Sequence, residues 1–235
     1  MNKNLIAGLV AAVLTAATAQ ARATDSRSLG GAVTAPSGAQ AASVDDAMKA
    51  VADWPEDAQN AAKAMTSRYG RPDVSGDRLL VWLNKTPFTK IVVMRDGVPH
   101  SFPTAHQDVL TEETKMAVPI EKLAELARFD GSLLVDRVKG TVAARGDTEA
   151  ANLLALNLAD EIVGGKRDAV SARQFYADAL GKQASGKSSP YTDGLNFSYA
   201  GRTGDADHEV VGTGAGTPPV TAPERTQDTV PSPQP

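Results

Sequence analysis

The sequence predicts an α+β fold, a single compact domain in which antiparallel β-hairpins pack against several α-helices. Two pairs of short β-rich runs are each joined by turn residues, which is typical of hairpins. The helical patterns lie in blocks around these pairs, and the stretch 150–163 is apolar on much of its circumference. A doubly wound parallel sheet would need single strands alternating with helices, so the pattern favours the α+β class.

Two helices are expected before the first strand pair. Ser43, followed by Asp45 and Asp46, marks the start of the first, because a hydroxyl accepts a free backbone N–H and acids suit the helix dipole there. The second begins near Pro55 and ends at Gly70. Its apolar residues recur at helical spacing on one face, which predicts core packing; they are Ala58, Ala61, Ala62, Met65 and Tyr69.

The first hairpin is expected from residues 78–83 and 90–94, joined by a turn at residues 84–87. Both faces of the first run are apolar, which predicts that the pair lies inside the sheet. Asp96-Gly97 is typical of a tight turn after the second run.

The remainder of the domain is expected to hold one further strand, three helices and a second hairpin. The strand is predicted at residues 109–118, and a helix follows from 119 to 129. The second hairpin spans residues 132–145. The most apolar helix, 150–163, is expected at the centre of the fold, and Asp168 caps a final helix.

Residues 1–23 have the pattern of a secretory signal peptide. Lys3 supplies the positive start, an apolar run without charge reaches Thr18, and Ala-x-Ala patterns place the cleavage near Ala21 or Ala23. The run is shorter than the roughly 20 apolar residues that a membrane span needs. We therefore expect a periplasmic or secreted protein with no membrane span in the mature chain.

The sequence divides into a folded centre and two flanks. Residues 24–43 are small and polar and predict a flexible linker, residues 44–182 predict the α+β domain, and the Gly/Pro/Ser/Thr-rich residues 183–235 predict a disordered tail. A few apolar residues in that tail are spaced so that a short segment could instead dock on the domain; these are Tyr191, Leu195, Phe197 and Tyr199.

Composition excludes several classes of function. The chain has no cysteine, so neither a disulfide nor a thiolate nucleophile exists. Loss of Lys3 and Arg22 with the signal lowers the basic residues from 24 to 22 against 28 acids. That acidic balance argues against nucleic acid or an anionic membrane as the partner.

The stretch 98–108 is the best candidate for a functional site. It combines two of the three histidines with a carboxylate and two prolines. Pro99 and Pro103 favour extended backbone before them, so the side chains of His100 and Phe102 should face the same way.

His106 and Asp108 would also share a side if the extended path continues. Two imidazoles and a carboxylate, with Glu112 or Glu113 near in sequence, could hold a divalent metal ion. The candidate metal ligands are His100, His106 and Asp108, and the candidate binding residues are these three with Phe102.

The alternative interpretation is a proline-stiffened loop. Phe102 would then be its hydrophobic anchor, and both histidines would hydrogen-bond to loop carbonyl groups. His-x5-His-x-Asp is not an established ligand spacing.

No catalytic residue can be nominated from the motifs. The serines lie in neither Gly-x-Ser-x-Gly nor Ser-x-x-Lys. The amides of Asn152 and Asn157, in the apolar helix, are expected to satisfy neighbouring backbone groups. Asp130 in Phe129-Asp130-Gly131-Ser132 is expected to end a helix and form a turn.

Several motifs in one order resemble a family of small exported bacterial proteins of unknown function: Pro99-His100-x-Phe102-Pro103-Thr104-x-His106-x-Asp108, Phe129-Asp130-Gly131-Ser132, Leu154-x-Leu156-Asn157-Leu158-Ala159 and Ala172-Arg173-x-x-Tyr176. The resemblance implies a bacterial periplasmic or secreted domain and transfers no catalytic residue. Members of that family often carry a cysteine where Gly146 stands here, so no thiol chemistry transfers either.

Two functional hypotheses follow. The first is a non-enzymatic, envelope-associated domain that binds another envelope protein or a small ligand and needs no cofactor. The second is a metal-dependent hydrolase that uses His100, His106 and Asp108. Convergence of the two imidazoles and the carboxylate beside a pocket would favour the hydrolase, and side chains that point apart would exclude it.

Overall fold

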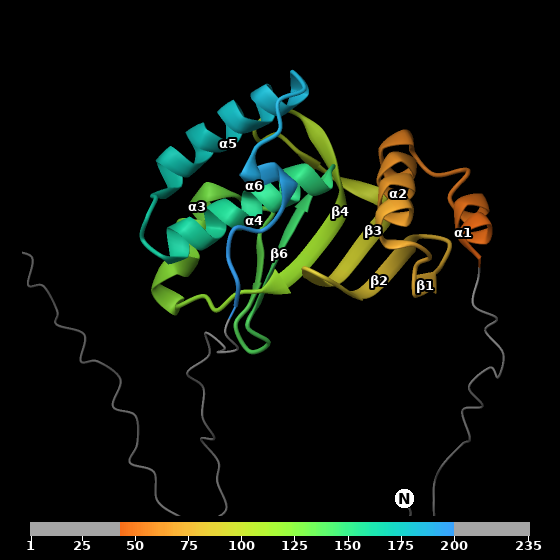
Figure 1. Ribbon diagram of the computed structural model, residues 1–235, viewed down its shortest axis with the longest axis horizontal. Helices are drawn as coiled ribbons and strands as arrows, with labels where there is room; N and C mark the ends of the chain where they lie inside the picture. Colours follow the sequence, from red (N-terminus) through yellow and green to blue (C-terminus); the bar gives the residue numbers. More distant parts are fainter. Residues whose placement is uncertain (1–42, 200–235) are drawn as a thin grey trace, which may run out of the picture. The chain divides into compact units, whose positions relative to one another are not determined.

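The computed structural model describes residues 43–199 as helices that pack on one β-sheet (Figure 1). The predicted signal peptide, the predicted linker up to residue 42 and the predicted tail from residue 200 lie outside the described residues. No helix among residues 43–199 is long and apolar enough to cross a membrane.

The fold contains α-helices, one short 3-10 helix and β-strands. The helices are α1 (Val44–Ala50), α2 (Glu56–Tyr69), the 3-10 helix η1 (Ile120–Lys122), α3 (Leu123–Phe129), α4 (Glu149–Val163), α5 (Ala169–Ala184) and α6 (Pro190–Asp193). The strands are β1 (Val74–Ser75), β2 (Leu79–Lys85), β3 (Phe88–His100), β4 (His106–Lys115), β5 (Leu134–Asp136) and β6 (Thr141–Gly146).

The sheet has the strand order β1-β2-β3-β4-β6-β5, and every neighbouring pair is antiparallel. Both predicted hairpins are present, as β2–β3 and β5–β6, so the α+β prediction is confirmed. Two predicted caps are also present. The Ser43 side chain accepts from the backbone N–H of Asp46 at the start of α1, and Asp168 accepts from that of Ser171 at the start of α5.

The first hairpin lies inside the sheet, as predicted, because β1 is the edge strand beside β2. Its two faces differ in exposure. Leu80 and Trp82 are fully buried among the core residues, whereas Leu83 and Met94 on the opposite face are 44% and 43% exposed. Apolar residues on both faces therefore indicated a central position in the sheet but not burial of both faces.

The predicted turn at Asp96-Gly97 is wrong. These residues lie within β3, whose pairing with β4 shifts between Val93 and Val98. A Cβ atom at Gly97 would lie 2.9 Å from Cβ of Gln107 on β4. Glycine is therefore needed here for close approach of two strands at an irregularity. The chain turns later, between the end of β3 and the start of β4.

Helix α4 is the central helix, as predicted. Most of its residues are buried, and it contacts β6, β4 and the other helices around it. Asn152 on α4 donates to the backbone oxygen of Leu110 and to Oε2 of Glu112, both on β4. A Cβ atom at Gly146 would lie 2.8 Å from Oδ1 of Asn152, so the glycine leaves room for this amide.

The folded unit extends beyond the predicted boundary at residue 182. Helix α6 and the segment after it lie along α4 (Figure 1), and Tyr191, Leu195 and Phe197 pack against the core. Asn157 holds this segment, because its amide donates to the backbone oxygens of Tyr191 and Gly194. The predicted domain ended too early because composition favoured disorder for this Gly/Ser-rich segment, whereas a few apolar residues and the buried amide of Asn157 hold it against the fold.

Candidate metal centre

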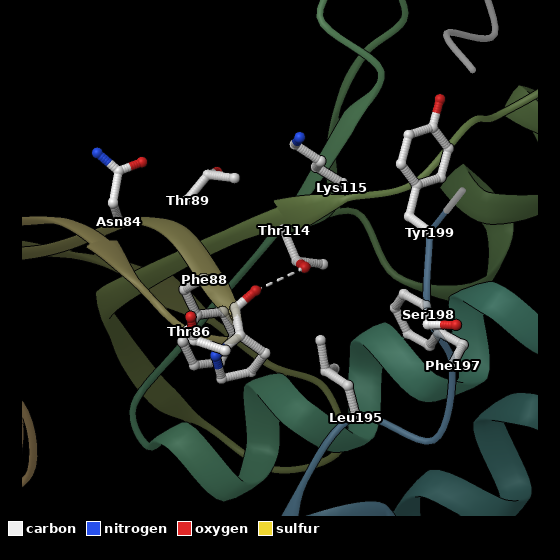
Figure 2. Close-up of a pocket in the computed structure, with 11 residues that line it drawn as sticks. Asn84, Thr86, Phe88, Thr89, Thr114, Lys115, Leu195, Phe197, Ser198 and Tyr199 are labelled. Atoms are coloured by element: carbon white, nitrogen blue, oxygen red, sulfur yellow. Dashed lines mark hydrogen bonds between the residues drawn. The ribbon is translucent and has the colours of Figure 1, made fainter. Parts of the chain in front are cut away.

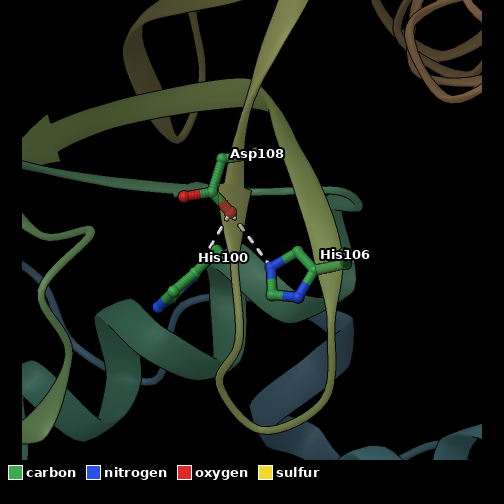
Figure 3. A group of neighbouring side chains, drawn as sticks. All are labelled: His100, His106 and Asp108. Atoms are coloured by element: carbon green, nitrogen blue, oxygen red, sulfur yellow. Dashed lines mark ion pairs between the residues drawn. The ribbon is translucent and has the colours of Figure 1, made fainter.

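The β3–β4 hairpin brings the predicted site residues together. His100 is the last residue of β3 and pairs with His106, the first residue of β4. Asp108 lies two residues further along β4, so its side chain points to the same side as that of His106. Figure 3 shows the two imidazoles beside the Asp108 carboxylate.

One oxygen of Asp108 lies between the two imidazoles. Oδ1 of Asp108 is 3.0 Å from Nε2 of His106 and 3.4 Å from Nδ1 of His100. The Asp108 side chain is 1% exposed, and those of His100 and His106 are 22% and 15% exposed. Within the described residues, Oδ1 of Asp108 and Nδ1 of His100 are buried without a hydrogen-bond partner.

The hydrogen bond of His106 Nδ1 determines whether Nε2, which faces Asp108, carries a hydrogen or a lone pair. Nδ1 of His106 is 2.9 Å from the backbone oxygen of Thr104, so this nitrogen carries the hydrogen. A neutral His106 then presents the lone pair of Nε2 to the carboxylate. Two acceptor atoms 3.0 Å apart repel each other unless a proton or a cation lies between them.

The two separations from Oδ1 of Asp108 suit a shared metal ion. Donor atoms that bind one first-row metal ion at about 2.0–2.2 Å lie roughly 2.9–3.5 Å from each other. Both distances from Asp108 Oδ1 fall in this range, and the three donor atoms all lie within 4.8 Å of one another. The Thr104 contact would fix the ring of His106, as hydrogen bonds to histidine ligands do in metal sites.

A second buried carboxylate, Asp130, stands beside His100. Its Oδ1 accepts from the backbone N–H and the hydroxyl of Ser132, both at 2.8 Å, and lies 3.8 Å from Nε2 of His100. The predicted turn at this motif is therefore present. The proximity of Asp130 to His100 was not predicted, because local sequence patterns do not relate residues that are 30 positions apart.

Arg145, on β6, is the second neighbour that the sequence did not reveal. Its Nε donates to Oδ2 of Asp108 at 3.3 Å. The two oxygens of Asp108 thus face different groups: Oδ2 faces the guanidinium, and Oδ1 faces the imidazoles.

Phe102 is the anchor of the turn, as the alternative interpretation predicted. Its ring stacks on Tyr176 with centroids 5.1 Å apart and meets Phe129 edge-on at 6.5 Å. The guanidinium carbon of Arg173 lies 3.7 Å from its centroid. Phe102 thus fastens the turn to α3 and α5, while the two histidines at the ends of the turn meet at Asp108.

The two glutamates considered as further ligands, Glu112 and Glu113, have other contacts. Glu113 forms ion pairs with Lys139 and Lys90 and accepts a hydrogen bond from the hydroxyl of Thr89. Glu112 points into the core and is fully buried.

Burial raises the pKa of Glu112 to about 8, the charge of Glu149 adds to this, and the Asn152 hydrogen bond and Arg68 oppose it. Within the described residues, its Oε1 has no hydrogen-bond partner. Glu112 is therefore a neutral acid in the core below about pH 8.

The described residues also line cavities apart from the histidines. One of about 390 Å³ lies between the β2–β3 turn, the end of β4 and the segment up to Tyr199, and Lys115 stands at its edge (Figure 2). Another of about 280 Å³ lies between α2 and the start of α4, beside Leu110 and Glu149.

Comparison with protein-family models, with curated proteins and with solved structures finds no match for this chain. The resemblance to a family of exported bacterial proteins therefore stays a prediction, and the site is interpreted from its own geometry.

Proposed function

We propose that this is an exported protein whose folded domain binds one divalent first-row transition metal ion. The ligands are Nδ1 of His100, Nε2 of His106 and Oδ1 of Asp108. The observation that carries the proposal is the buried Oδ1 of Asp108, which has no hydrogen-bond partner among the described residues although two imidazole nitrogens face it. A metal ion would remove this mismatch, since all three donors have lone pairs to offer.

A metal titration of the full chain tests the proposal. After treatment with a chelator, calorimetry with Zn²⁺, Ni²⁺, Cu²⁺ and Mn²⁺ should give one strong site per chain for at least one of these ions. His106→Ala should weaken that site by about 100-fold or more, because one of three ligands is lost. His208→Ala is the matched control, since it removes the third histidine of the sequence, which lies outside the described residues. Absence of heat with all four ions, or equal binding by His106→Ala, contradicts the proposal.

Asp130 is expected to support the metal site without being a ligand. With Nδ1 of His100 on the metal ion, its Nε2–H faces the Asp130 carboxylate, and such partners orient metal-binding histidines. Asp130→Asn keeps an oxygen for the two Ser132 hydrogen bonds and removes only the charge. We expect metal affinity to fall by about 10- to 100-fold with little change in the thermal midpoint of the metal-free chain. Asp136→Asn, on β5, is the control, and unchanged metal affinity in Asp130→Asn would show that Asp130 only shapes its turn.

A metal-dependent hydrolase is the second candidate. The observation that favours it is the number of protein donors, because three ligands leave a coordination position for water. Binding without turnover is preferred, since the cavities described above are lined by other residues. Metal-dependent hydrolysis of p-nitrophenyl esters by the full chain, absent in His106→Ala, would reverse this preference.

A further inference from the structure

We propose that the metal ion at His100, His106 and Asp108 takes a phosphate-class oxyanion as a further ligand, and that Arg145 binds the same anion. This inference rests on the proposed metal site and names the class of ligand that completes it. Three observations support it. One oxygen of Asp108 faces the proposed metal position and the other faces Arg145. Arg145 has N–H donors left for a ligand, and the side chains around the carboxylate are partly exposed.

The Asp108 carboxylate places the metal position and the guanidinium next to each other. Oδ1 faces the imidazoles, and Oδ2 is 3.3 Å from Nε of Arg145. An ion bound to Oδ1 at about 2 Å is thus separated from Arg145 by a single carboxylate group. The oxygens of a tetrahedral oxyanion are about as far apart as those of a carboxylate, so the anion can place one oxygen on the metal ion and another on the guanidinium.

Arg145 has donors left for such a ligand. Its contact with Asp108 uses Nε alone. Its two terminal nitrogens have no hydrogen-bond partner within residues 43–199. A guanidinium presents paired N–H groups that match the oxygens of phosphate, which makes arginine a preferred phosphate ligand.

The charge of the site also favours an anion. A divalent ion and Arg145 together carry three positive charges, whereas Asp108 and Asp130 supply two negative charges. Arg173, stacked over Phe102, adds a further positive charge nearby. An oxyanion would neutralise this excess, and it would do so at the coordination position that the three protein ligands leave open.

The exposed groups lie where a ligand from solvent can reach them. The Arg145 side chain is 28% exposed and the two imidazoles are 22% and 15% exposed, while Asp108 beneath them is 1% exposed. The carboxylate therefore forms the floor of the site, and the edges of the imidazoles and the guanidinium form its accessible side.

Cobalt loading gives a direct readout. The full chain is loaded with Co²⁺, its visible absorption spectrum is recorded, and inorganic phosphate is titrated in. We expect a saturable change in the Co²⁺ spectrum, because phosphate replaces water on the ion. At Co²⁺ concentrations that saturate both proteins, Arg145→Gln should raise the Kd for phosphate by about 10- to 100-fold, as expected for loss of charged hydrogen bonds. Arg78→Gln, which removes an exposed arginine paired with Asp96, should behave like the wild type.

The outcomes separate the two proposals. A Co²⁺ spectrum that phosphate does not change overturns the oxyanion inference and leaves the metal site in place. Phosphate binding that Arg145→Gln does not weaken overturns the role of Arg145. Failure of the wild type to bind Co²⁺, or any of the ions in the calorimetric titration, overturns the metal site and with it this inference.

Discussion

Replacement of Glu112 by glutamine is expected to raise the free energy of unfolding by on the order of 4 kcal/mol at pH 9 and to change it little at pH 4. Glu112 is 0% exposed, and burial raises its pKa from 4.5 to about 8. Its neutral form therefore favours the folded state. That contribution is complete below about pH 4.5 and is lost as the pH rises to about 8, at roughly 1.4 kcal/mol for each pH unit.

Glutamine keeps the groups that the neutral acid offers. Its carbonyl oxygen can accept from Asn152, as Oε2 of Glu112 does. Its amide places a donor at the position of Oε1, as the protonated acid can also do. The two side chains differ mainly in the ability to ionise, so the difference between their stabilities isolates the charge.

Urea unfolding of the wild type and Glu112→Gln at pH 4, 7 and 9 measures the effect. Glu113→Gln is the control on the same strand. Burial acts to raise the pKa of Glu113, but the bonds from Lys139, Thr89 and Lys90 outweigh it and the pKa is lowered. Glu113 thus stabilises the fold at neutral and higher pH, and its replacement should be destabilising there. Parallel pH profiles for the wild type and Glu112→Gln would contradict the assignment of a buried neutral acid.

Phe102→Ala is expected to lower the free energy of unfolding by about 3 kcal/mol, and neither histidine variant should approach that loss in the metal-free chain. Phe102 fills the space between Tyr176, Phe129 and Arg173, and its removal leaves a cavity at the contact of the turn with α3 and α5. His100→Ala and His106→Ala remove partly exposed rings that face a carboxylate.

Urea unfolding after chelation compares the three variants. Phe102→Leu is the matched control, because it retains most of the apolar volume and should lose less than Phe102→Ala. If the histidine variants lose as much stability as Phe102→Ala, the stretch is scaffold. If they lose little stability but lose metal binding, it is a site held by a scaffold residue.

Local signals in the sequence account for most of the secondary structure. Ser43 and Asp168 cap helices where predicted, because a cap depends only on a side chain and the next few backbone N–H groups. The errors fall where residues distant in sequence decide the outcome. Gly97 is close to Gln107 across the hairpin, and the segment after α5 is held by Asn157 of α4.

The candidate site was predicted only in part, because some of its residues are related by local spacing and others meet only through the tertiary fold. His106 and Asp108 share a side through the two-residue period of a strand, which the sequence alone can show. His100 joins them because the chain turns between residues 100 and 106, so that the two histidines pair across the hairpin. Asp130 follows α3 and Arg145 lies on β6, and neither has a local pattern that points to Asp108.

The sequence by itself determined the α+β class, the order of the main elements and the stretch that carries the imidazoles and carboxylate, since these follow from periodicity and short-range hydrogen bonding. Only the tertiary structure decided that β3 continues past Gly97, that Glu112 is fully buried and that one oxygen of Asp108 faces two imidazoles. These properties depend on which distant segments pack together and on how much water they exclude.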